Sequence, residues 1–312
     1  MMATNSTKSE KWTYKAPEPV GMQVYRAPSL LQPHRVRDAI QDAHKGTIPP
    51  LIGFFCGLSS PPVAKVAAQL GYDVVFVDWE HSSTNVETMT QMVHDIQYIS
   101  EGKSMAFVRV PGHDHASIGH ALDAGASIIV PQVDTVEQAK HVAAASRFGA
   151  KINGKRSAPP FRWLQGTSDM LIDSSLSLWE NLNHQSAVII QIESAEGIRN
   201  LDAMLTEVGD QIDSVWLGSL DARVSMGLQN AYGEEPEWMK LKALYESTLR
   251  KHNMPSSGLA LGPPAVRAKM AKGKSFMVSG SDVYGILGQA AGLADMRQSF
   301  PQMNYEQVYD RI

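Results

Sequence analysis

Short apolar runs recur eight times along this chain, and stretches with helical spacing lie between them. The fifth and sixth runs, Ala187–Ile192 and Ser214–Gly218, are hydrophobic on both faces, which is typical of strands in a parallel sheet covered by helices. The eight runs begin near residues 51, 72, 105, 127, 187, 214, 256 and 275. A right-handed series of eight strand–helix units closes most economically as a (β/α)8 TIM barrel. An open doubly wound sheet is disfavoured, because no G-x-G-x-x-G follows the first strand.

The first 33 residues differ in composition from the rest and are rich in Pro, Ser and Lys. We predict that residues 1–33 form an N-terminal extension without an independent fold, which lies across the barrel or a neighbouring subunit. Residues 34–312 are predicted to form a single barrel domain, with a helix over His34–Lys45 that closes its bottom. An irregular inserted loop is expected at about residues 149–184.

The composition excludes several classes of function. A net charge of −4 and a pI of about 6.2 give no electrostatic case for a nucleic-acid partner. The single cysteine, Cys56, excludes an intramolecular disulfide and a cysteine-cluster metal site. No run approaches the roughly eighteen apolar residues of a membrane span, and the polar N-terminus does not have the pattern of a signal peptide. We therefore expect a soluble, cytoplasmic protein without a membrane partner.

Charged and polar residues gather where the predicted strands end. The carboxyl ends of parallel strands meet at one rim, where barrel enzymes carry their catalytic residues. Glu193 and Asp221 follow the fifth and sixth strands, and carboxylates are the ligands that a hard cation prefers. The same rim carries Asp78, Trp79, Glu80, His81, Arg109, Pro131, Gln132, Gln191 and Ser279–Asp282. Such a set is suited to binding a 2-oxo acid through a divalent cation and to stabilising enolate charge.

Each residue alone has a simpler explanation. Taken alone, Glu193 would complement a helix dipole, Asp78 and Asp282 would cap helices, and His81 would be an ordinary loop histidine. Arg109 pairs with a nearby acid to hold loops together. The common placement of these residues at the ends of successive strands favours a site, except for Asp282, where helix capping is the better prediction.

Other reactive residues lie away from this set. His113, His115 and His120 lie on or beside the third predicted helix rather than at a strand end, and we interpret them as surface residues. Cys56 follows the first strand directly, and a small core residue is a better interpretation than a nucleophile.

Lysine positions separate two ways of forming an enolate in a barrel. Schiff-base enzymes need an amine inside the barrel, usually on a strand. None of the eight apolar runs has an interior lysine, and the nearest ones, Lys103 and Lys274, precede strands at the opposite rim. The sequence therefore favours metal-assisted enolisation over covalent imine catalysis.

At these positions the chain resembles the HpcH/HpaI aldolase family, the metal-dependent class II pyruvate aldolases. The resemblance covers residues from about Leu51 to Phe300. The inserted loop, the extension and the GKRS stretch are most similar to macrophomate-synthase-like fungal members. The matching stretches are GYDVVFVDWEHS, FVRVP, DAGASIIVPQV, GKRS, IIQIESAEGIRNLD, the G-x-x-D of Gly218–Asp221, and VSGSDVYGIL.

The resemblance implies a role for each site residue. Glu193 and Asp221 would ligate Mg²⁺, or alternatively Mn²⁺ or Co²⁺, with waters and the 2-oxo acid as further ligands. Arg109 would neutralise the enolate oxygen. His81, acting through a metal-bound water and oriented by a carboxylate such as Asp78, would move the proton. The substrate-binding residues would be Trp79, Gln191, Gly218, Ser219 and Leu220, with backbone amides near Ser219–Asp221 holding the substrate carboxylate.

Two positions depart from the family pattern. Around the second ligand, members usually read Gly-Pro-x-Asp, whereas this chain reads Gly218-Ser219-Leu220-Asp221-Ala222-Arg223. Loss of the proline frees an N–H group, so we expect a reshaped carboxylate pocket with Arg223 as an extra cation near the rim. Gln132 stands where the macrophomate-like members carry histidine, which argues against their particular reaction.

The sequence favours a divalent-metal-dependent lyase that acts through a pyruvate enolate. It would cleave 4-hydroxy-2-oxo acids, decarboxylate oxaloacetate, or pass the enolate to an acceptor in secondary metabolism. The alternatives are a CoA-ester lyase of the citrate-lyase-β type and a non-catalytic oxo-acid-binding pseudoenzyme. Because family members are commonly hexamers with an exchanged C-terminal helix, the resemblance also implies a homo-oligomer, such as a hexamer or trimer of dimers.

Overall fold

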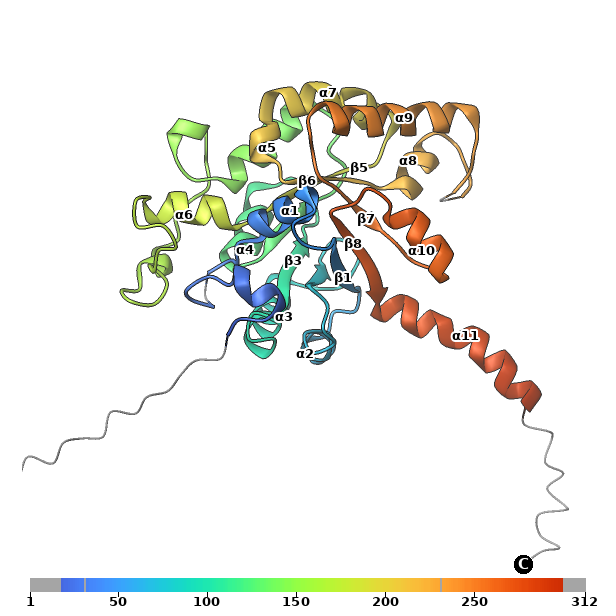
Figure 1. The fold of residues 1–312 in the computed structure, drawn as a ribbon, viewed down its shortest axis with the longest axis horizontal. Coiled ribbons are helices and arrows are strands. Elements are labelled where there is room, and N and C mark those ends of the chain that lie inside the picture. The colour runs from blue at the N-terminus through green and yellow to red at the C-terminus, as the bar shows by residue number, and fades with distance from the viewer. Residues whose placement is uncertain (1–17, 31, 231, 300–312) are drawn as a thin grey trace, which may run out of the picture.

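Eight parallel strands pair in sequence order, and the eighth pairs with the first, so the sheet closes into a barrel (Figure 1). The computed structural model describes residues 18–30, 32–230 and 232–299. The predicted (β/α)8 TIM barrel is confirmed, and a strand forms at each predicted run. The strands are β1 (Leu51–Cys56), β2 (Val74–Asp78), β3 (Met105–Arg109), β4 (Ser127–Val130), β5 (Val188–Ile192), β6 (Ser214–Leu217), β7 (Ser256–Leu259) and β8 (Phe276–Ser281).

Helices connect the strands, and local signals set where several of them begin. α5 begins with a capping box, in which the Thr135 hydroxyl accepts from the Gln138 N–H and the Gln138 side chain accepts from the Thr135 N–H. The helices are α1 (Val36–Lys45), α2 (Pro61–Ala67), α3 (Val86–Ile99), α4 (His115–Asp123), α5 (Val136–Ser146), α6 (Leu178–Gln185), α7 (Ala195–Val208), α8 (Ser219–Ser225), α9 (Pro236–Lys251), α10 (Pro264–Ala271) and α11 (Asp282–Ser299).

Side chains alternate between two faces of each strand and so form two separate cores. One core lies between the strands and the helices and includes Val75 and Val77 of β2. The other fills the barrel interior with aromatic rings, where Phe107 stacks on Phe276 at 5.3 Å and Trp216 lies edge-on at 6.1 Å. This interior core forms the floor beneath the C-terminal ends of the strands.

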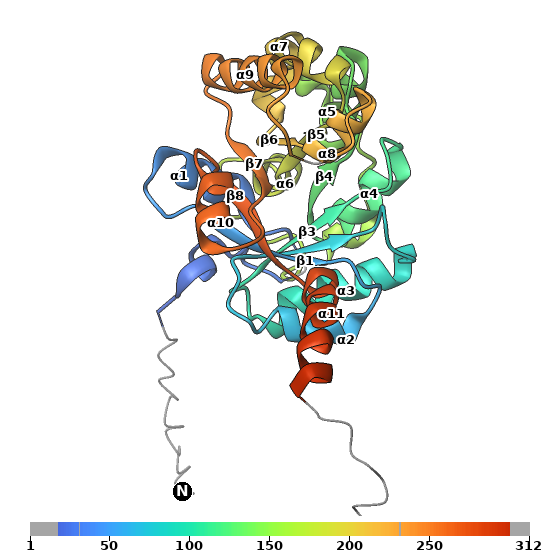
Figure 2. The ribbon, with the colours of Figure 1, turned by 90° about the vertical axis from the view of Figure 1, so that its right-hand side faces the viewer.

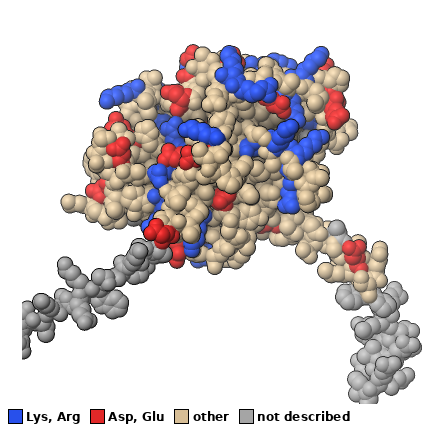
Figure 3. Space-filling model, viewed as in Figure 1, with Lys and Arg blue, Asp and Glu red and all other residues tan. Residues whose placement is uncertain are grey.

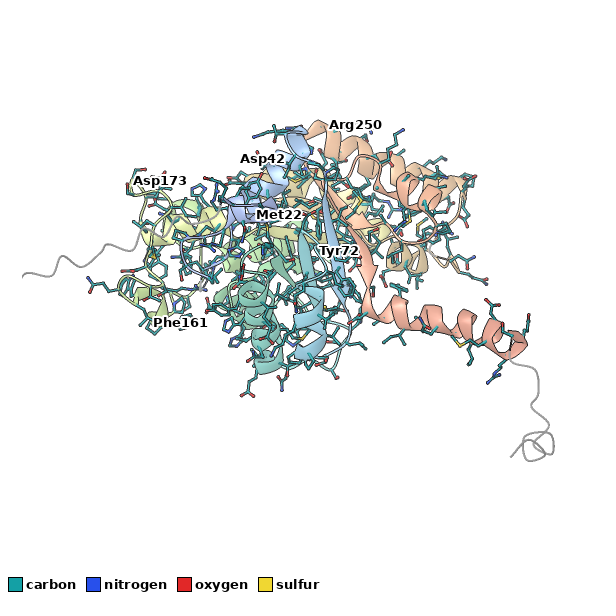
Figure 4. All side chains as sticks on the ribbon, turned by 60° about the horizontal axis from the view of Figure 1, so that its bottom comes forward. Met22, Asp42, Tyr72, Phe161, Asp173 and Arg250 are labelled. Atoms are coloured by element: carbon teal, nitrogen blue, oxygen red, sulfur yellow. The ribbon has the colours of Figure 1, made fainter. Side chains whose placement is uncertain are left out.

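The described part of the N-terminal segment packs against the same barrel. Met22 and Tyr25 are buried in the interior core together with α1, and Figure 4 labels Met22 and, on α1, Asp42. The Tyr25 hydroxyl donates to Asp42 Oδ2 at 2.7 Å. Gln32 Nε2 donates to the carbonyl oxygen of Met170 at 2.7 Å. Residues 18–30 and 32–33 thus lie against the barrel. Residues 1–17 and 31 are outside the described ranges, and the boundary at residue 33 stays a prediction.

The stretch at 149–184 is not irregular throughout, because it runs into α6. Ser177 and Glu180 form a capping box at its start, a Ser-x-x-Glu signal that the sequence analysis overlooked. This inserted segment lies on the side of the barrel away from α11 (Figures 1 and 4), where Phe161 and Asp173 mark it. The short helix α8, directly after β6, was also not predicted.

The last helix does not lie along the barrel wall. α11 contacts β1 and β8 and then projects away from the body (Figures 1 and 2). Its surface is mostly uncharged (Figure 3), and it exposes Tyr284, Ile286, Leu287, Leu293 and Met296. Within the described ranges, no helix is both long and apolar enough to cross a membrane.

A buried histidine in the N-terminal segment predicts a pH dependence of stability. His34 is 1% exposed, and its Nδ1 accepts from the Ala27 N–H at 3.2 Å. Burial, with a smaller contribution from Arg26, lowers the pKa of His34 from 6.5 to about 4. The unfolded chain therefore takes up this proton at higher pH than the folded protein. The resulting stability of about 3 kcal/mol is complete above pH 6.5 and is lost as the pH falls towards 4.

The measurement is the free energy of unfolding of wild type and His34→Gln between pH 7 and 4. We expect the difference between the two proteins to shrink by about 3 kcal/mol over that range. His120→Gln, at an exposed histidine, should keep a constant difference from wild type. A difference for His34→Gln that does not change with pH would contradict a neutral, buried ring.

Candidate active site

Arg109 and Asp78 form a bidentate pair at the C-terminal ends of two adjacent strands. The register of β2 and β3 pairs these two residues directly. Arg109 Nε donates to Asp78 Oδ1 and Arg109 Nη2 donates to Asp78 Oδ2, both at 2.8 Å. The Asp78 side chain is 1% exposed, so this pair is fixed in a nearly dry environment. Asp78 therefore orients the guanidinium, as the simpler explanation of Arg109 suggested.

Glu80 is the carboxylate nearest to the imidazole of His81. Glu80 Oε2 lies 3.2 Å from Arg109 Nε and 3.6 Å from His81 Nε2. The Asp78 carboxylate accepts only weakly from the His81 backbone N–H, at 3.5 Å. Burial raises the pKa of Glu80 above its usual range, although Arg109 opposes the shift. Glu80, rather than the predicted Asp78, is therefore the carboxylate beside the His81 ring, and the His81 side chain is largely exposed to solvent.

Glu193 is buried at the end of β5 and held by a backbone amide. It is 7% exposed, and its Oε2 accepts from the Gln132 N–H at 3.0 Å. Gln191 Nε2 donates to Glu193 Oε1 at 3.3 Å. Burial raises the pKa of Glu193 to about 7, and the negative charges of Asp221 and Glu80 act in the same direction. Glu193 therefore sits where a nearby positive charge would stabilise its ionised form.

Asp221 reaches the same rim from the first turn of α8. Its charge contributes to the raised pKa of both Glu193 and Glu80, which places the three carboxylates within electrostatic reach of one another. Asp221 is exposed, unlike Glu193. One metal-type carboxylate is thus buried, and the other faces the open side of the site.

The donor set fits a magnesium-type cation that keeps free coordination positions. Among the residues the structure describes, no group of three or more His, Cys, Asp or Glu side chains forms a complete protein cage for a metal. Mg²⁺ is commonly bound by one or two carboxylates, with waters and substrate oxygens as the other ligands. The buried Gln191 Oε1 has no hydrogen-bond partner among the described residues, so it is free to accept from a water in such a site. Glu193 and Asp221 therefore fit the predicted cation.

Gly218 leaves room for the Glu193 carboxylate. A Cβ atom at this position would meet Glu193 Oε1 at an impossible separation and Glu193 Cγ at 2.6 Å. The Gly218 N–H donates to the Ile192 carbonyl at 3.0 Å, which fixes the backbone against β5. Gly218 thus has a steric reason to be glycine next to the predicted ligand.

The other predicted substrate contacts are placed unevenly. Ser219 is half-buried and Leu220 is exposed, and both lie in the first turn of α8 beside Asp221. The Trp79 side chain is half-buried and packs against the core between strands and helices, and its contact with a substrate stays a prediction. Trp79 directly follows Asp78, and successive side chains of an extended strand point to opposite faces, so these two side chains point apart.

Arg223 does not supply an extra cation to the rim, which corrects the sequence-based expectation. Its side chain is 1% exposed and donates to both Glu235 oxygens, at 2.7 and 2.9 Å. The guanidinium also lies over the Trp238 ring, 5.5 Å from its centroid. Two residues along a helix correspond to a rotation of about 200°, so Arg223 points away from Asp221. It anchors the loop between α8 and α9 instead.

Two further expectations from the sequence need correction. Asp282 is the first residue of α11, and its carboxylate accepts from the N–H groups of Gly57 and Leu58, so it ties the loop after β1 to α11. The cap-type bond at this end of the helix comes from Ser281, whose hydroxyl accepts from the Tyr284 N–H at 3.3 Å. His113 is not a plain surface residue, because its ring bonds to the Pro131 carbonyl at the end of β4. Cys56 is buried, as expected for a core residue.

The site also uses groups that the sequence analysis did not assign. The hydrogen bond from the Gln132 amide to Glu193 carries no signal in the sequence, because any residue type can supply an N–H. Glu80 was recognisable from its place after β2, but its role beside His81 depends on side-chain directions. No strand residue of the described barrel is a lysine, consistent with the argument against a Schiff base.

The sequence profile of the HpcH/HpaI aldolase/citrate lyase family matches residues 51–283, from the first strand into the last helix. This chain belongs to that family. It is therefore a carbon–carbon lyase by family. The 2-keto-3-deoxy-L-rhamnonate aldolases of Klebsiella pneumoniae and Salmonella gallinarum are 30% and 29% identical to it over 235 residues. In both cases the match covers 74% of this chain and 82% of the relative.

Solved structures of similar proteins agree with the assignment of this chain to the HpcH/HpaI family. The crystal structure of macrophomate synthase superposes with a TM-score of 0.80 at 30% identity, over 88% of this chain and 93% of that protein. An HpcH/HpaI family protein from Burkholderia cenocepacia has a TM-score of 0.71 at 23% identity, over 84% of this chain and 99% of that protein, and supports the fold alone.

The close approach of Gly218 to Glu193 yields a prediction. We expect Gly218→Ala to displace the Glu193 carboxylate and to lower kcat/KM of the lyase reaction about a hundredfold, as a misplaced catalytic group does. The matched control is Gly209→Ala, where an added Cβ would meet Leu205 and Met254 at ordinary contact distances of 3.6 Å and more. Steady-state kinetics and thermal unfolding of both variants are the measurements. Full activity in Gly218→Ala would show that Glu193 need not stay where it is.

Proposed function

We propose that this protein is a divalent-metal-dependent lyase that acts through a pyruvate enolate. The observation that supports it most directly is the charge balance at the rim. Among the described residues, the carboxylates of Asp78, Glu80 and Glu193 act on the Arg109 guanidinium, and Asp221 adds its charge to Glu80 and Glu193. Such an excess of negative charge in a partly buried place favours binding of a divalent cation.

Glu193 and Asp221 would hold the cation, with Mg²⁺ the first choice and Mn²⁺ or Co²⁺ as alternatives. When bound, the cation supplies Lewis-acid polarisation of the substrate ketone. Gln191, beside Glu193, would contact the substrate or a water. The N–H groups at the start of α8, from Ser219 to Asp221, would hold the substrate carboxylate.

Arg109 would stabilise the oxygen on which enolate charge develops. Asp78 and Glu80 fix its guanidinium in advance, so little reorganisation is needed as the charge forms. His81 is placed at the solvent side of this cluster, and its Nε2 would accept and return a proton. The nearby Glu80 carboxylate would stabilise the protonated ring.

The substrate class proposed is a 4-hydroxy-2-oxo acid, cleaved to pyruvate and an aldehyde, or oxaloacetate, which loses carbon dioxide to the same enolate. The curated relatives support it, because a 2-keto-3-deoxy sugar acid is a 4-hydroxy-2-oxo acid. The CoA-ester lyase and pseudoenzyme alternatives gain no support from the described site. Because Arg223 pairs with Glu235, the pocket proposed for the substrate carboxylate lacks the extra cation that the sequence suggested as a departure from the family pattern.

A decarboxylation assay tests the proposal. Purified protein is incubated with oxaloacetate and Mg²⁺, and the loss of enol absorbance is followed with and without EDTA. We expect turnover that EDTA abolishes and that added Mg²⁺ restores. Glu193→Gln should lose at least about a hundredfold in kcat/KM, because it removes a ligand charge. Equal rates with and without EDTA would rule out the metal-dependent mechanism. A pyruvate adduct trapped by borohydride would point to a lysine mechanism instead.

We also propose that the protein is a homo-oligomer in which α11 packs against another copy. The helix projects from the barrel with its apolar side chains exposed, and Ile52 on the outer face of β1 is exposed as well. Burying the apolar side chains of α11 and the outer face of β1 between copies would remove this apolar surface from water. A cytoplasmic location stays a prediction.

Light scattering after size-exclusion chromatography tests the oligomer. The full-length chain should have a mass of several 34.1 kDa subunits, consistent with a hexamer. Ile286→Glu with Leu287→Glu should lower that mass, because two charges cannot be buried in an apolar interface. Leu171→Glu, on the inserted segment away from α11, should leave it unchanged. A monomeric wild-type chain would contradict the proposal.

A further inference from the structure

The peptide group between Pro131 and Gln132 is fixed at both of its polar atoms. Its carbonyl oxygen accepts from His113 Nε2 at 2.6 Å, and its N–H donates to Glu193 Oε2 at 3.0 Å. A carbonyl can only accept, so Nε2 of His113 must carry a hydrogen. Because the peptide group is planar, a ring that fixes the carbonyl also fixes the direction of the N–H.

The backbone at this point is held in an uncommon conformation. Gln132 has a φ of 50°, in the left-handed region that residues other than glycine seldom adopt. Its side chain is exposed, so the residue meets Glu193 through its main chain. A strained residue persists only where its surroundings hold it, and such residues cluster at functional sites. The bonds to His113 and Glu193 are two such restraints.

His113 is itself held in place by a residue of helix α5. His141 of α5 donates from Nε2 to the His113 carbonyl oxygen at 2.9 Å, and His113 is half-buried in the loop between β3 and α4. The loop after β3, the end of β4 and the end of β5 are therefore joined in one series of hydrogen bonds. The series ends at Glu193, the buried carboxylate of the site.

We propose that His113 is a positioning residue for the metal-binding carboxylate of Glu193, acting through the Pro131–Gln132 peptide group. The inference rests on the proposed function, because it requires Glu193 to bind the cation. With Oε2 held by the Gln132 N–H, the Glu193 carboxylate keeps one orientation. Residues that orient a metal ligand in this way typically contribute about 10- to 100-fold to metal affinity or activity.

The test measures the Mn²⁺ affinity of the metal-free, full-length protein by isothermal titration calorimetry. We expect His113→Ala to weaken Mn²⁺ binding about tenfold. His113→Gln, whose side-chain amide can donate to the same carbonyl, should recover most of the affinity. His120→Ala removes an exposed histidine from α4 and should bind Mn²⁺ as the wild type does. Equal affinity in His113→Ala and wild type would overturn the proposal, as would a loss that His113→Gln does not repair.

Glu193→Gln separates this proposal from the proposed function. If it binds Mn²⁺ as tightly as wild type, the metal assignment itself is wrong. If it loses affinity while His113→Ala keeps it, only the role of His113 fails.

A second pair of variants covers the case in which His113→Ala does not fold. Gln132→Gly keeps the N–H and tolerates a positive φ, so its affinity for Mn²⁺ should match wild type. Gln132→Val disfavours that conformation, so its peptide should shift and its affinity should fall. Equal affinities in these two variants would also overturn the proposal.

Discussion

The pairing of Arg109 with Asp78 is the interaction on which the rest of the site depends. Asp78 is buried and Arg109 is largely shielded from solvent at the ends of adjacent strands, and removing one partner of a buried pair costs about 3–5 kcal/mol. The guanidinium in turn attracts Glu80 and Glu193, yet it leaves the rim with more negative than positive charge. The raised pKa values of Glu80 and Glu193 show that burial opposes their ionisation. A bound cation would relieve this opposition, which is why the rim suits metal-dependent chemistry.

The barrel makes that arrangement possible by separating inward-facing from outward-facing positions. Phe76, Phe107, Trp216 and Phe276 fill the interior, and the rim residues lie above them at the next inward positions. Asp78 is two residues beyond Phe76, and Arg109 is two residues beyond Phe107. The same alternation sends Trp79 and Val77 to the outer core. A rigid, dry floor and a polar rim therefore follow from one strand periodicity.

This periodicity also explains what could be predicted from the sequence. The eight strands were recognisable because most are apolar runs that alternate with helical spacing, and the rim acids because they follow such runs. Arg223 was expected at the rim because the short helix α8, which turns its side chain towards Glu235, was not predicted. The roles of Gly218, His113 and the Gln132 amide depend on contacts between distant segments. Such contacts leave no local pattern, so only the structure shows them.

Anomalous diffraction from crystals soaked with Mn²⁺ and pyruvate tests the central claim most directly. The account predicts one strong Mn²⁺ peak within bonding distance of carboxylate oxygens from both Glu193 and Asp221. It also predicts the pyruvate carboxylate near the first N–H groups of α8 and the ketone oxygen facing Arg109. A Mn²⁺ peak elsewhere, or pyruvate bound at the rim without a cation between the two carboxylates, would contradict it.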